Sequence, residues 1–336
     1  MSVGPVRPRV ALVYPLRHVC GEELLSETVE LVRAKGQDEA ALREVLADCK
    51  GVVTRGPATL TERLIAGAPK LQFIVCSGSG SDSVDIEAAT RRGIPVVSNT
   101  GAAPRAVAEF AIGAMIFMQR RMLMLHSAVA SPNLDWARRT DDFRGNEMTG
   151  STVGVVGFGA IGQLVARMAR AAFDVKVMAY DPFAPATAFE SLATRCDSLD
   201  ELMAACRTVS VHVPLLKSTR NLIGRKQLRL LGPEGVLVDT ARGGIVNEVD
   251  LVEALKADEI RGAALDVFDP EPPNREKVEF LLTAPNLLLT PHCAGLTDQA
   301  FVNLAMGAAR NVLDLLAGRR PANIVNPQVY DRLISA

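Results

Sequence analysis

Three polar side chains with complementary chemistry each follow a predicted buried strand. Arg242 comes after "VLVDTA", Glu271 lies within "LDVFDPEPP", and His292 follows "NLLLTP". Because the carboxyl ends of parallel strands meet at one edge of a sheet, where ligands bind, we expect these side chains to converge. Each one alone has a plainer interpretation, as a surface ion pair, a solvated loop charge or a packing histidine. Their predicted convergence favours a functional site.

The three residue types suit the reversible reduction of a 2-keto acid, in which a hydride reaches the carbonyl carbon and a proton reaches its oxygen. The imidazole of His292 titrates near neutrality, so it can donate the proton in one direction and accept it in the other. A carboxylate such as Glu271 on the other ring nitrogen fixes the tautomer and favours the charged form. The guanidinium of Arg242 can hold the substrate carboxylate through a fixed fork of donors.

A glycine-rich stretch, "VGVVGFGAIG", supplies the expected source of the hydride. Gly157, Gly159 and Gly162 have the G-x-G-x-x-G spacing between a strand pattern and a helix pattern, which is typical of a dinucleotide-binding turn. Asp181 ends the next predicted strand, where a carboxylate can accept from the ribose hydroxyls and repel a 2′-phosphate. The pattern predicts NAD in preference to NADP; the alternative is a purely structural turn.

Predicted strands alternate with predicted helices along nearly the whole chain, which indicates doubly wound parallel sheets. The capping residues Ser198, with Glu201 three positions later, and Asn247 mark two helix starts. The predicted strands are 9–15, 51–55, 71–77, 94–99, 151–157, 175–181, 208–214, 235–241, 260–268 and 286–292. The other predicted helices are 22–34, 38–48, 85–92, 104–129 and 298–318.

Composition excludes several classes of function. The chain has 336 residues, which suggests two domains because single cores stop growing near ~250–300 residues. A net charge of −1 gives no basic field for nucleic acid and no polybasic membrane patch. Six scattered cysteines without a C-x-x-C pair indicate reduced thiols, no metal site and a cytoplasmic location. Pairing of Cys293 with His292 as a thiol nucleophile is disfavoured, because neighbours in extended chain point to opposite sides.

Several long motifs, in order, resemble the D-isomer-specific 2-hydroxyacid dehydrogenase family over nearly the whole length. They are "GSDSVDIEAATRRGIPVVSN", "AVAEFAIG", "VGVVGFGAIG", "VHVPLLKSTRNLIG", "VDTARGGIVNE", "ALDVFDPEP" and "LLTPHCAG". The resemblance implies that Arg242, Glu271 and His292 are catalytic, with Arg242 and His292 also binding substrate. It implies that backbone N–H groups at Ser79 and Gly80 receive the substrate carboxylate.

The resemblance also implies a cofactor site, in which Asp266 holds the nicotinamide carboxamide. The implied cofactor contacts are Gly157, Gly159, Ala160, Ile161, Gly162, Asp181, His212, Val213, Pro214, Thr219, Thr240, Ala241, Asp266 and Gly295. His212 is then a wall of this site and not a second acid.

The same resemblance predicts the architecture. A Rossmann dinucleotide-binding domain at 102–296 is inserted in a flavodoxin-like substrate domain made of 1–101 and 297–336. Closure of one on the other would exclude water from the reaction. The helix at 104–129, which is apolar on more than one face, is expected to form a homodimer.

Departures from the family pattern narrow the activity. Ala160 stands where Arg is common, which removes one pyrophosphate contact, and Glu271 counts against formate dehydrogenases, which have Gln there. Cys76 stands where the phosphoglycerate branch often has Arg, and the loop "CSGSGS" has no second cation, which disfavours a phosphorylated substrate. Reduction of glyoxylate or hydroxypyruvate is one alternative for the specific activity. A non-catalytic NAD(H)-sensing protein resembling a corepressor is another.

Overall fold

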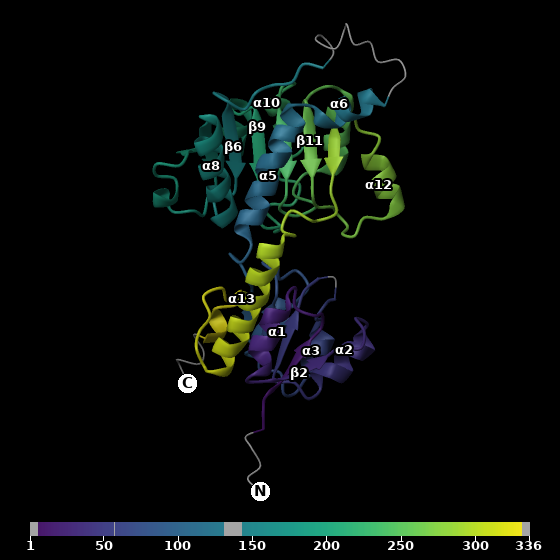
Figure 1. The fold of residues 1–336 in the computed structure, drawn as a ribbon, viewed down its shortest axis with the longest axis vertical. Helices are drawn as coiled ribbons and strands as arrows, with labels where there is room; N and C mark the ends of the chain where they lie inside the picture. Colours follow the sequence, from purple (N-terminus) through teal and green to yellow (C-terminus); the bar gives the residue numbers. More distant parts are fainter. Residues whose placement is uncertain (1–5, 57, 131–142, 331–336) are drawn as a thin grey trace. The chain divides into compact units, whose positions relative to one another are not determined.

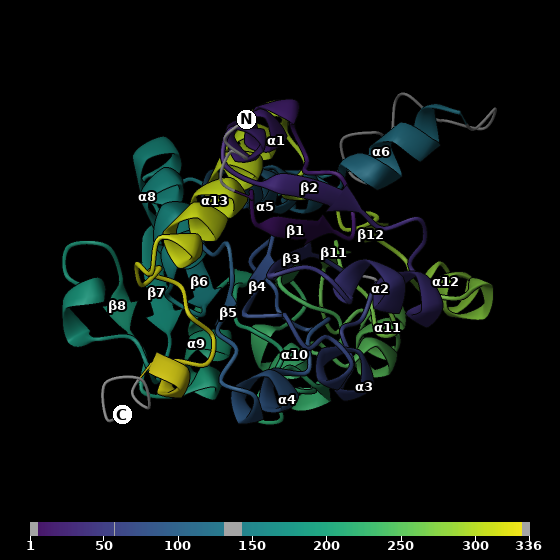
Figure 2. The ribbon, with the colours of Figure 1, turned by 90° about the horizontal axis from the view of Figure 1, so that it is seen from below.

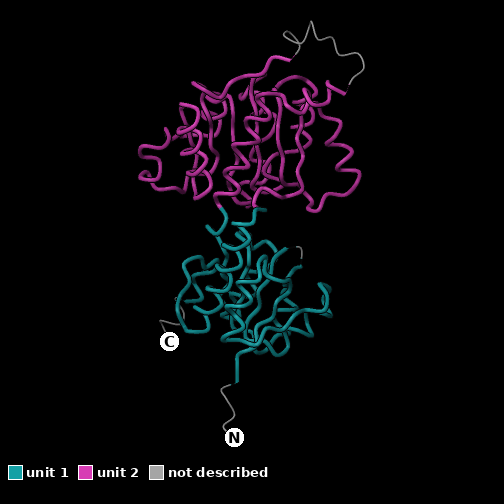
Figure 3. The backbone as a smooth tube through the Cα atoms, in the orientation of Figure 1, with its two compact units in different colours: residues 1–103, 296–336 teal, residues 104–295 magenta. Residues whose placement is uncertain are grey.

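The computed structural model describes residues 6–56, 58–130 and 143–330, and the chain divides into two compact units (Figure 3). Unit 1 comprises Met1–Ala103 and Leu296–Ala336, and unit 2 comprises Pro104–Gly295. Each unit is built on a sheet whose strand pairs are all parallel. This confirms the predicted fold class.

Unit 1 has a five-stranded sheet in the order β2-β1-β3-β4-β5, the flavodoxin-like order (Figure 2). Alternate strand residues face opposite sides: Val10 and Leu12 pack with α1 and α13, whereas Ala11 packs with α2, α3 and α4. Its elements are β1 (Arg9–Leu12), α1 (Val19–Ser26), β2 (Glu30–Arg33), α2 (Glu39–Leu46), β3 (Gly51–Thr54), α3 (Glu62–Ala66), β4 (Phe73–Cys76), α4 (Ile86–Arg91), β5 (Val96–Val97) and α13 (Asp298–Leu316).

Unit 2 has a seven-stranded sheet in the order β8-β7-β6-β9-β10-β11-β12, so the direction of winding reverses between β6 and β9. Helices α5 and α8 cover one face (Figure 1), and α9, α10 and α11 pack against the other. Its strands are β6 (Thr152–Val156), β7 (Lys176–Tyr180), β8 (Thr194–Arg195), β9 (Thr208–Val211), β10 (Val236–Asp239), β11 (Gly262–Leu265) and β12 (Leu287–Leu289). Its helices are α5 (Pro104–Gln119), α6 (Met122–Val129), α8 (Ala160–Phe173), α9 (Leu199–Ala205), α10 (Arg225–Leu231), α11 (Glu248–Lys256) and α12 (Arg275–Leu281).

Two predicted helices differ from the structure. The helix predicted at 22–34 ends at Ser26, and residues 30–33 form β2, because they pair in register with β1 at the edge of the sheet. The helix predicted at 104–129 is wrong as a single element. Arg121 has φ 53°, a left-handed conformation that cannot continue a right-handed helix, so α5 and α6 are separate.

The predicted caps are largely confirmed. Asn247 accepts from the N–H groups of Val249 and Asp250 at the start of α11. Ser198 accepts from the Glu201 N–H at the start of α9, 3.1 Å away. The return bond of the capping box differs, because the Glu201 carboxylate accepts from the Asp197 N–H and not from that of Ser198. Local hydrogen bonding therefore fixes where the helices beside the site begin.

Candidate active site

The glycine-rich turn lies at the point where the unit 2 sheet reverses its winding. Gly157 has φ 89°, and a Cβ atom there would lie 2.6 Å from the His212 carbonyl oxygen. A Cβ at Gly162 would lie 2.2 Å from the Gly157 oxygen, so only glycine lets α8 start this close to β6. Gly159 is the N-cap of α8 and makes no side-chain cap bond, and a Cβ there would meet nothing within 4 Å. The turn therefore leaves open backbone at a helix N-terminus, the environment that suits a pyrophosphate.

Asp181 ties the end of β7 to this turn. Its Oδ2 accepts from the Phe158 N–H at 2.8 Å, and its Oδ1 accepts from the N–H groups of Phe183 and Ala184. A carboxylate has about four lone-pair positions, so capacity remains for the ribose hydroxyls. Ala160 and Ile161 form the first turn of α8 beside it.

His212 follows β9 on the other side of the reversal. Its Nε2 lies 2.9 Å from the Ser210 hydroxyl, and its buried Nδ1 has no hydrogen-bond partner among the described residues. Burial lowers the pKa of His212 to about 3, so this imidazole stays neutral at physiological pH and cannot serve as a proton donor. Its partnerless Nδ1 fits contact with a bound ligand.

The remaining residues implied for the cofactor lie on loops at the same end of the sheet. The Thr219 hydroxyl is used within its own loop, where it donates to the Pro214 carbonyl and accepts from the Leu216 N–H. The buried Thr240 hydroxyl has no hydrogen-bond partner among the described residues, so it is available to bond with a ligand. Val213 and Ala241 pack against the hydrophobic core of unit 2. Gly295 is the last residue of unit 2.

Glu271 and His292 are in direct contact, as the sequence predicts for two side chains at neighbouring strand ends. His292 Nδ1 is hydrogen-bonded to Glu271 Oε1, and the two side chains are 44% and 36% exposed. The His292 backbone is in the left-handed region, at φ 53°, and its N–H donates to the Asp266 carbonyl at 2.8 Å. This conformation is uncommon for a residue with a side chain and is maintained by the surrounding bonds. The contact leaves Nε2 as the ring nitrogen that can exchange a proton.

Asp266 holds the loop that carries His292. This carboxylate is 1% exposed and accepts three bonds, from the Cys293 N–H, the Ala294 N–H and the Thr290 hydroxyl, at 2.9, 2.9 and 2.6 Å. The family resemblance implied only a cofactor role for Asp266, and this positioning role was not predicted. The signal was present, because a buried acid directly after a strand must find donors.

Arg242 lies at the tip of β10, the strand next to β11, and its loop packs on the loop of Glu271. A Cβ at Gly243 would lie 1.8 Å from the Phe268 carbonyl oxygen, so the two backbones touch. The Glu248 carboxylate, paired with Lys277, accepts from the Asp269 N–H and links the same two loops. Gly243 and Glu248 were not predicted as site residues, although the Gly pair after Arg242 was visible in the sequence.

Asp239, the last residue of β10, holds the backbone just before Arg242. Its Oδ1 accepts from the Ala241 N–H at 2.8 Å, and its side chain is buried. Burial raises the pKa of Asp239 to about 7, against the Ala241 N–H and the Arg242 charge, which lower it. Ser79 and Gly80, the predicted carboxylate-binding residues, lie in unit 1, just past the carboxyl end of β4.

Comparisons with known proteins agree with this geometry. Residues 112–294 match the model of the "D-isomer specific 2-hydroxyacid dehydrogenase, NAD binding domain". The chain is 36% identical to a D-3-phosphoglycerate dehydrogenase of Methanocaldococcus jannaschii, across 95% of this chain and 59% of that protein. It is 33% identical to a glyoxylate reductase of Thermococcus litoralis, across 88% of this chain and 89% of that protein. The holo form of D-mandelate dehydrogenase from Rhodotorula graminis superposes with a TM-score of 0.85 at 26% identity, covering 95% of this chain and 98% of that one.

The chain belongs to the D-isomer-specific 2-hydroxyacid dehydrogenase family. Its NAD-binding domain lies in unit 2 and contains the glycine turn, Asp181, and the polar atoms of His212 and Thr240 that have no partner in the described part of the chain. These groups fit NAD. The chain spans about three-fifths of the length of the phosphoglycerate dehydrogenases that it matches. For the protein of Methanocaldococcus jannaschii, the matched share is 59%.

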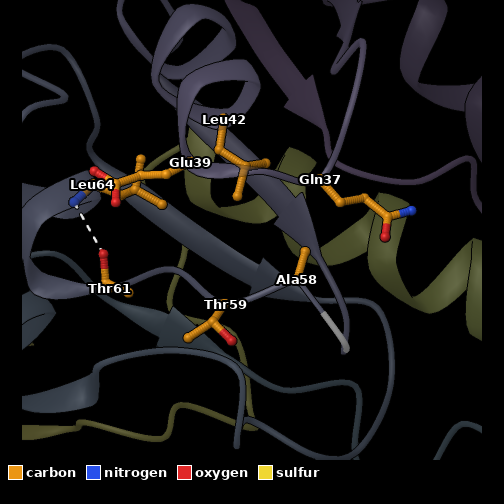
Figure 4. Close-up of a pocket in the computed structure, with 7 residues that line it drawn as sticks. All are labelled: Gln37, Glu39, Leu42, Ala58, Thr59, Thr61 and Leu64. Carbon is orange, nitrogen blue, oxygen red and sulfur yellow. Dashed lines mark hydrogen bonds between the residues drawn. The ribbon is translucent and has the colours of Figure 1, made fainter. Parts of the chain in front are cut away.

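Other features of this family member lie outside the site. A pocket of about 330 Å³ lies between α2 and α3 (Figure 4), and none of the predicted site residues lines it. Among the described residues, no cluster of His, Cys, Asp and Glu side chains could hold a metal ion. Within the same part of the chain, no helix is long and apolar enough to cross a membrane. The pocket is lined by Gln37, Glu39, Leu42, Ala58, Thr59, Thr61 and Leu64.

Proposed function

We propose that the chain is an NAD-dependent oxidoreductase that interconverts a 2-keto acid and a D-2-hydroxy acid. The observation that carries this proposal is the contact between His292 and Glu271 at the carboxyl edge of the NAD-binding sheet. A carboxylate on Nδ1 fixes the tautomer and stabilises the imidazolium, so Nε2 is the atom that gives a proton to the carbonyl oxygen or accepts it from the alcohol. The bound cofactor would supply the hydride as NADH in the reduction and accept it as NAD⁺ in the oxidation.

Arg242 is the proposed substrate anchor. The backbone on either side of Arg242 is held in place, by the bond from the Ala241 N–H to Asp239 and by the close contact of Gly243 with Phe268. The Arg242 side chain therefore extends from a fixed backbone position. A guanidinium binds a carboxylate through two parallel charge-assisted bonds, which orient a small anion for hydride attack. Backbone N–H groups at Ser79 and Gly80 are the proposed second contact for that carboxylate.

The decisive experiment measures NADH oxidation with a panel of 2-keto acids that includes glyoxylate and hydroxypyruvate. We expect turnover, and we expect His292→Ala to lower kcat by about 10²–10⁴-fold, the usual contribution of a general acid. His18→Asn is the matched control, because His18 caps α1 through its side chain and Asn keeps a capping acceptor. Wild-type turnover by His292→Ala would refute the assignment. NADH binding without any turnover would favour the NAD(H)-sensing alternative.

The proposed preference for NAD over NADP depends on Asp181. Removing its charge in Asp181→Ala takes away the repulsion of a 2′-phosphate, and we expect the ratio of kcat/KM for NADH to that for NADPH to fall about tenfold. An unchanged ratio would count against Asp181 as the residue that selects the cofactor.

We further propose a cytoplasmic homodimer formed through α5 and α6. None of the side chains of α6 is buried, although the helix begins "MLML", and Met122 and Val129 are 39% and 68% exposed. The six cysteines are free thiols, which suits a reducing compartment. Light scattering should give twice the chain mass, and Met122→Glu should weaken the dimer more than Leu282→Glu, a change at an exposed position of unit 2 outside α6. A monomer at all concentrations would refute the dimer.

A further inference from the structure

The segment that carries Glu271 has little hydrogen bonding of its own. Residues 266–274 join β11 to α12 without regular secondary structure. In "DPEPPN", the prolines on both sides of Glu271 lack the N–H group that a backbone hydrogen bond needs. Among the described residues, the Glu271 carboxylate is hydrogen-bonded only to His292. The orientation of Glu271 therefore depends on what holds the two ends of this segment.

One buried carboxylate contacts the chain on both sides of Glu271. Glu248 Oε1 accepts from the Asp269 N–H at 3.1 Å, just before Glu271. Glu248 Oε2 forms an ion pair with the ammonium group of Lys277, in the first turn of α12 beyond the segment. The Lys277 N–H in turn donates to the side chain of Asn274, the N-cap of α12, at 2.8 Å. The segment therefore begins and ends at contacts that lead to Glu248.

Glu248 is itself held in place. It is the first residue of α11, and its side chain is 5% exposed. Asn247 caps this helix, and Leu251 and Val252 in the next turn are buried in the hydrophobic core of unit 2. The free N–H groups and the dipole of a helix N-terminus favour a carboxylate at this position. A displacement of Glu248 would therefore require a displacement of α11.

The charged groups around Glu248 come from three elements. Lys277 of α12 supplies its counter-charge. Asp239, at the end of β10, is close enough to be affected: burial raises the pKa of Asp239 to about 7, and the negative charge of Glu248 acts in the same direction. The Asp269 side chain is paired separately, with Arg220 at 2.5 Å. Glu248 and Lys277 thus form an ion pair of their own behind the catalytic residues.

We propose that Glu248 and Lys277 are positioning residues, which hold Glu271 where its carboxylate meets Nδ1 of His292. The inference rests on the proposed dehydrogenase function and deepens it. Neither residue contacts the imidazole, so both act through Glu271. Loosening the segment weakens the contact that stabilises the imidazolium, and His292 then loses its proton at a lower pH.

The first test is the pH dependence of 2-keto acid reduction. His292 must carry a proton in this direction, so kcat/KM falls as pH rises. Glu248→Ala releases both ends of the segment, and we expect kcat to fall about 10–100-fold and the midpoint of the pH profile to move down by ~0.5 pH unit or more. KM should change little, because Asp239 and Gly243 still hold the backbone of Arg242.

The second test separates the two ends. Glu248→Gln keeps an acceptor for the Asp269 N–H but loses the ion pair, and Lys277→Gln removes the same ion pair from α12. Each should move the midpoint in the direction of Glu248→Ala by a smaller amount. The double variant should be no worse than the stronger single variant, because both changes break one contact. Lys277 is 22% exposed, so Lys277→Gln carries the test where Glu248→Ala does not fold.

A direct titration of the imidazole separates His292 from Asp239, which titrates in the same pH range. The chain has four histidines, and the His292 signal in an NMR spectrum is the one that His292→Ala removes. In Glu248→Ala this signal should titrate at a lower pH than in the wild type. An unchanged titration in a folded variant would overturn the inference, even with a lower kcat, because the loss would then be general structural damage.

Glu253→Gln is the matched control. It removes an exposed, ion-paired carboxylate of the same helix and should leave kcat and the His292 titration unchanged. NADH binding, followed by fluorescence, should be equal in all variants, and a parallel loss of NADH binding would also overturn the inference. No turnover of any 2-keto acid by the wild type would instead refute the proposed function, while the NMR titration would still test the contact between Glu271 and His292.

Discussion

The carboxyl edges of the two sheets carry polar side chains that are bonded in opposite ways. In unit 2, the carboxylates of Asp239, Asp266 and Glu271 are each bonded to the chain itself. In unit 1, Arg17 and Arg55 stack on aromatic rings and have no hydrogen bond or ion pair with any other described residue. Proton transfer needs a fixed orientation, which internal hydrogen bonds provide, whereas binding of an anion needs charge that the chain has not already neutralised. The comparison predicts that changes which remove a hydrogen bond or a close contact at the unit 2 edge lower stability and that changes at the unit 1 edge do not.

The largest effect is expected for Gly243→Ala. The added Cβ would lie 1.8 Å from the Phe268 oxygen, and a backbone atom cannot move aside as a flexible side chain can. We expect the free energy of unfolding to fall by more than ~3 kcal/mol, because the loops of Arg242 and Glu271 must separate. Urea unfolding and kcat/KM measure the two consequences.

Gly113→Ala is the control for this prediction. Gly113 lies inside α5, and a Cβ there meets nothing within 4 Å, so alanine should stabilise the helix by ~0.5–1 kcal/mol. If Gly243→Ala were equally well tolerated, the two loops would not depend on this contact, and the unit 2 edge would be less rigid than the comparison requires.

Asp266→Ala should cause the second largest loss of stability. The change leaves the N–H groups of Cys293 and Ala294 and the Thr290 hydroxyl without their acceptor. An unsatisfied buried donor costs ~1–3 kcal/mol, and water can reach part of this loop, so we expect a total loss of ~2–3 kcal/mol. Chemical denaturation gives the loss of stability. Amide hydrogen exchange at residues 290–294 should rise with it, and unchanged protection there would show that another group holds the His292 loop.

The sequence predicted the parts of the site that depend on strand order and local pattern. Glu271 and His292 meet because each follows a strand at one sheet edge, and the glycine turn is defined by its spacing. Contacts between distant residues were not predictable. The backbone contact of Gly243 with Phe268 and the nearness of Arg17 to Arg55 arise only once the strands are paired.

The differences in the fold have the same origin. Residues 30–33 have a helix-compatible pattern but form β2, because pairing with β1 satisfies their backbone at the sheet edge. The helical pattern likewise runs through Arg121, where the backbone turns left-handed and separates α5 from α6. In both places the surrounding structure overrides local preference.

The ionisation of Asp239 should make the stability of unit 2 depend on pH. Burial raises its pKa to about 7, well above the ordinary ~3.9 of an unfolded chain, so between these values the folded state holds a proton that the unfolded state has lost. The wild type should therefore lose stability as pH rises from about 4 to 7, by at most ~1.4 kcal/mol per unit from this group. Asp239→Asn removes this dependence.

The measurement is the difference in the free energy of unfolding between Asp239→Asn and the wild type at several pH values. The difference should increase in favour of the variant up to pH ~7 and then level off, by at most ~4 kcal/mol overall, since about three pH units contribute ~1.4 kcal/mol each. A difference that stays flat would mean that the carboxyl is already ionised below pH 5, with the Ala241 N–H and the Arg242 charge outweighing burial.

The smallest effect is expected for Arg55→Gln in the absence of substrate. Loss of the contact with the Tyr14 ring costs ~0.5–1 kcal/mol at a partly exposed site, and relief of the repulsion from Arg17 offsets part of this loss. The free energy of unfolding should change by less than ~0.5 kcal/mol. A loss as large as that of Asp266→Ala would mean that Arg55 is a structural residue of unit 1, and the contrast between the two sheet edges would fail there. Near-neutral stability would instead show that unit 1 does not need this cation in order to fold.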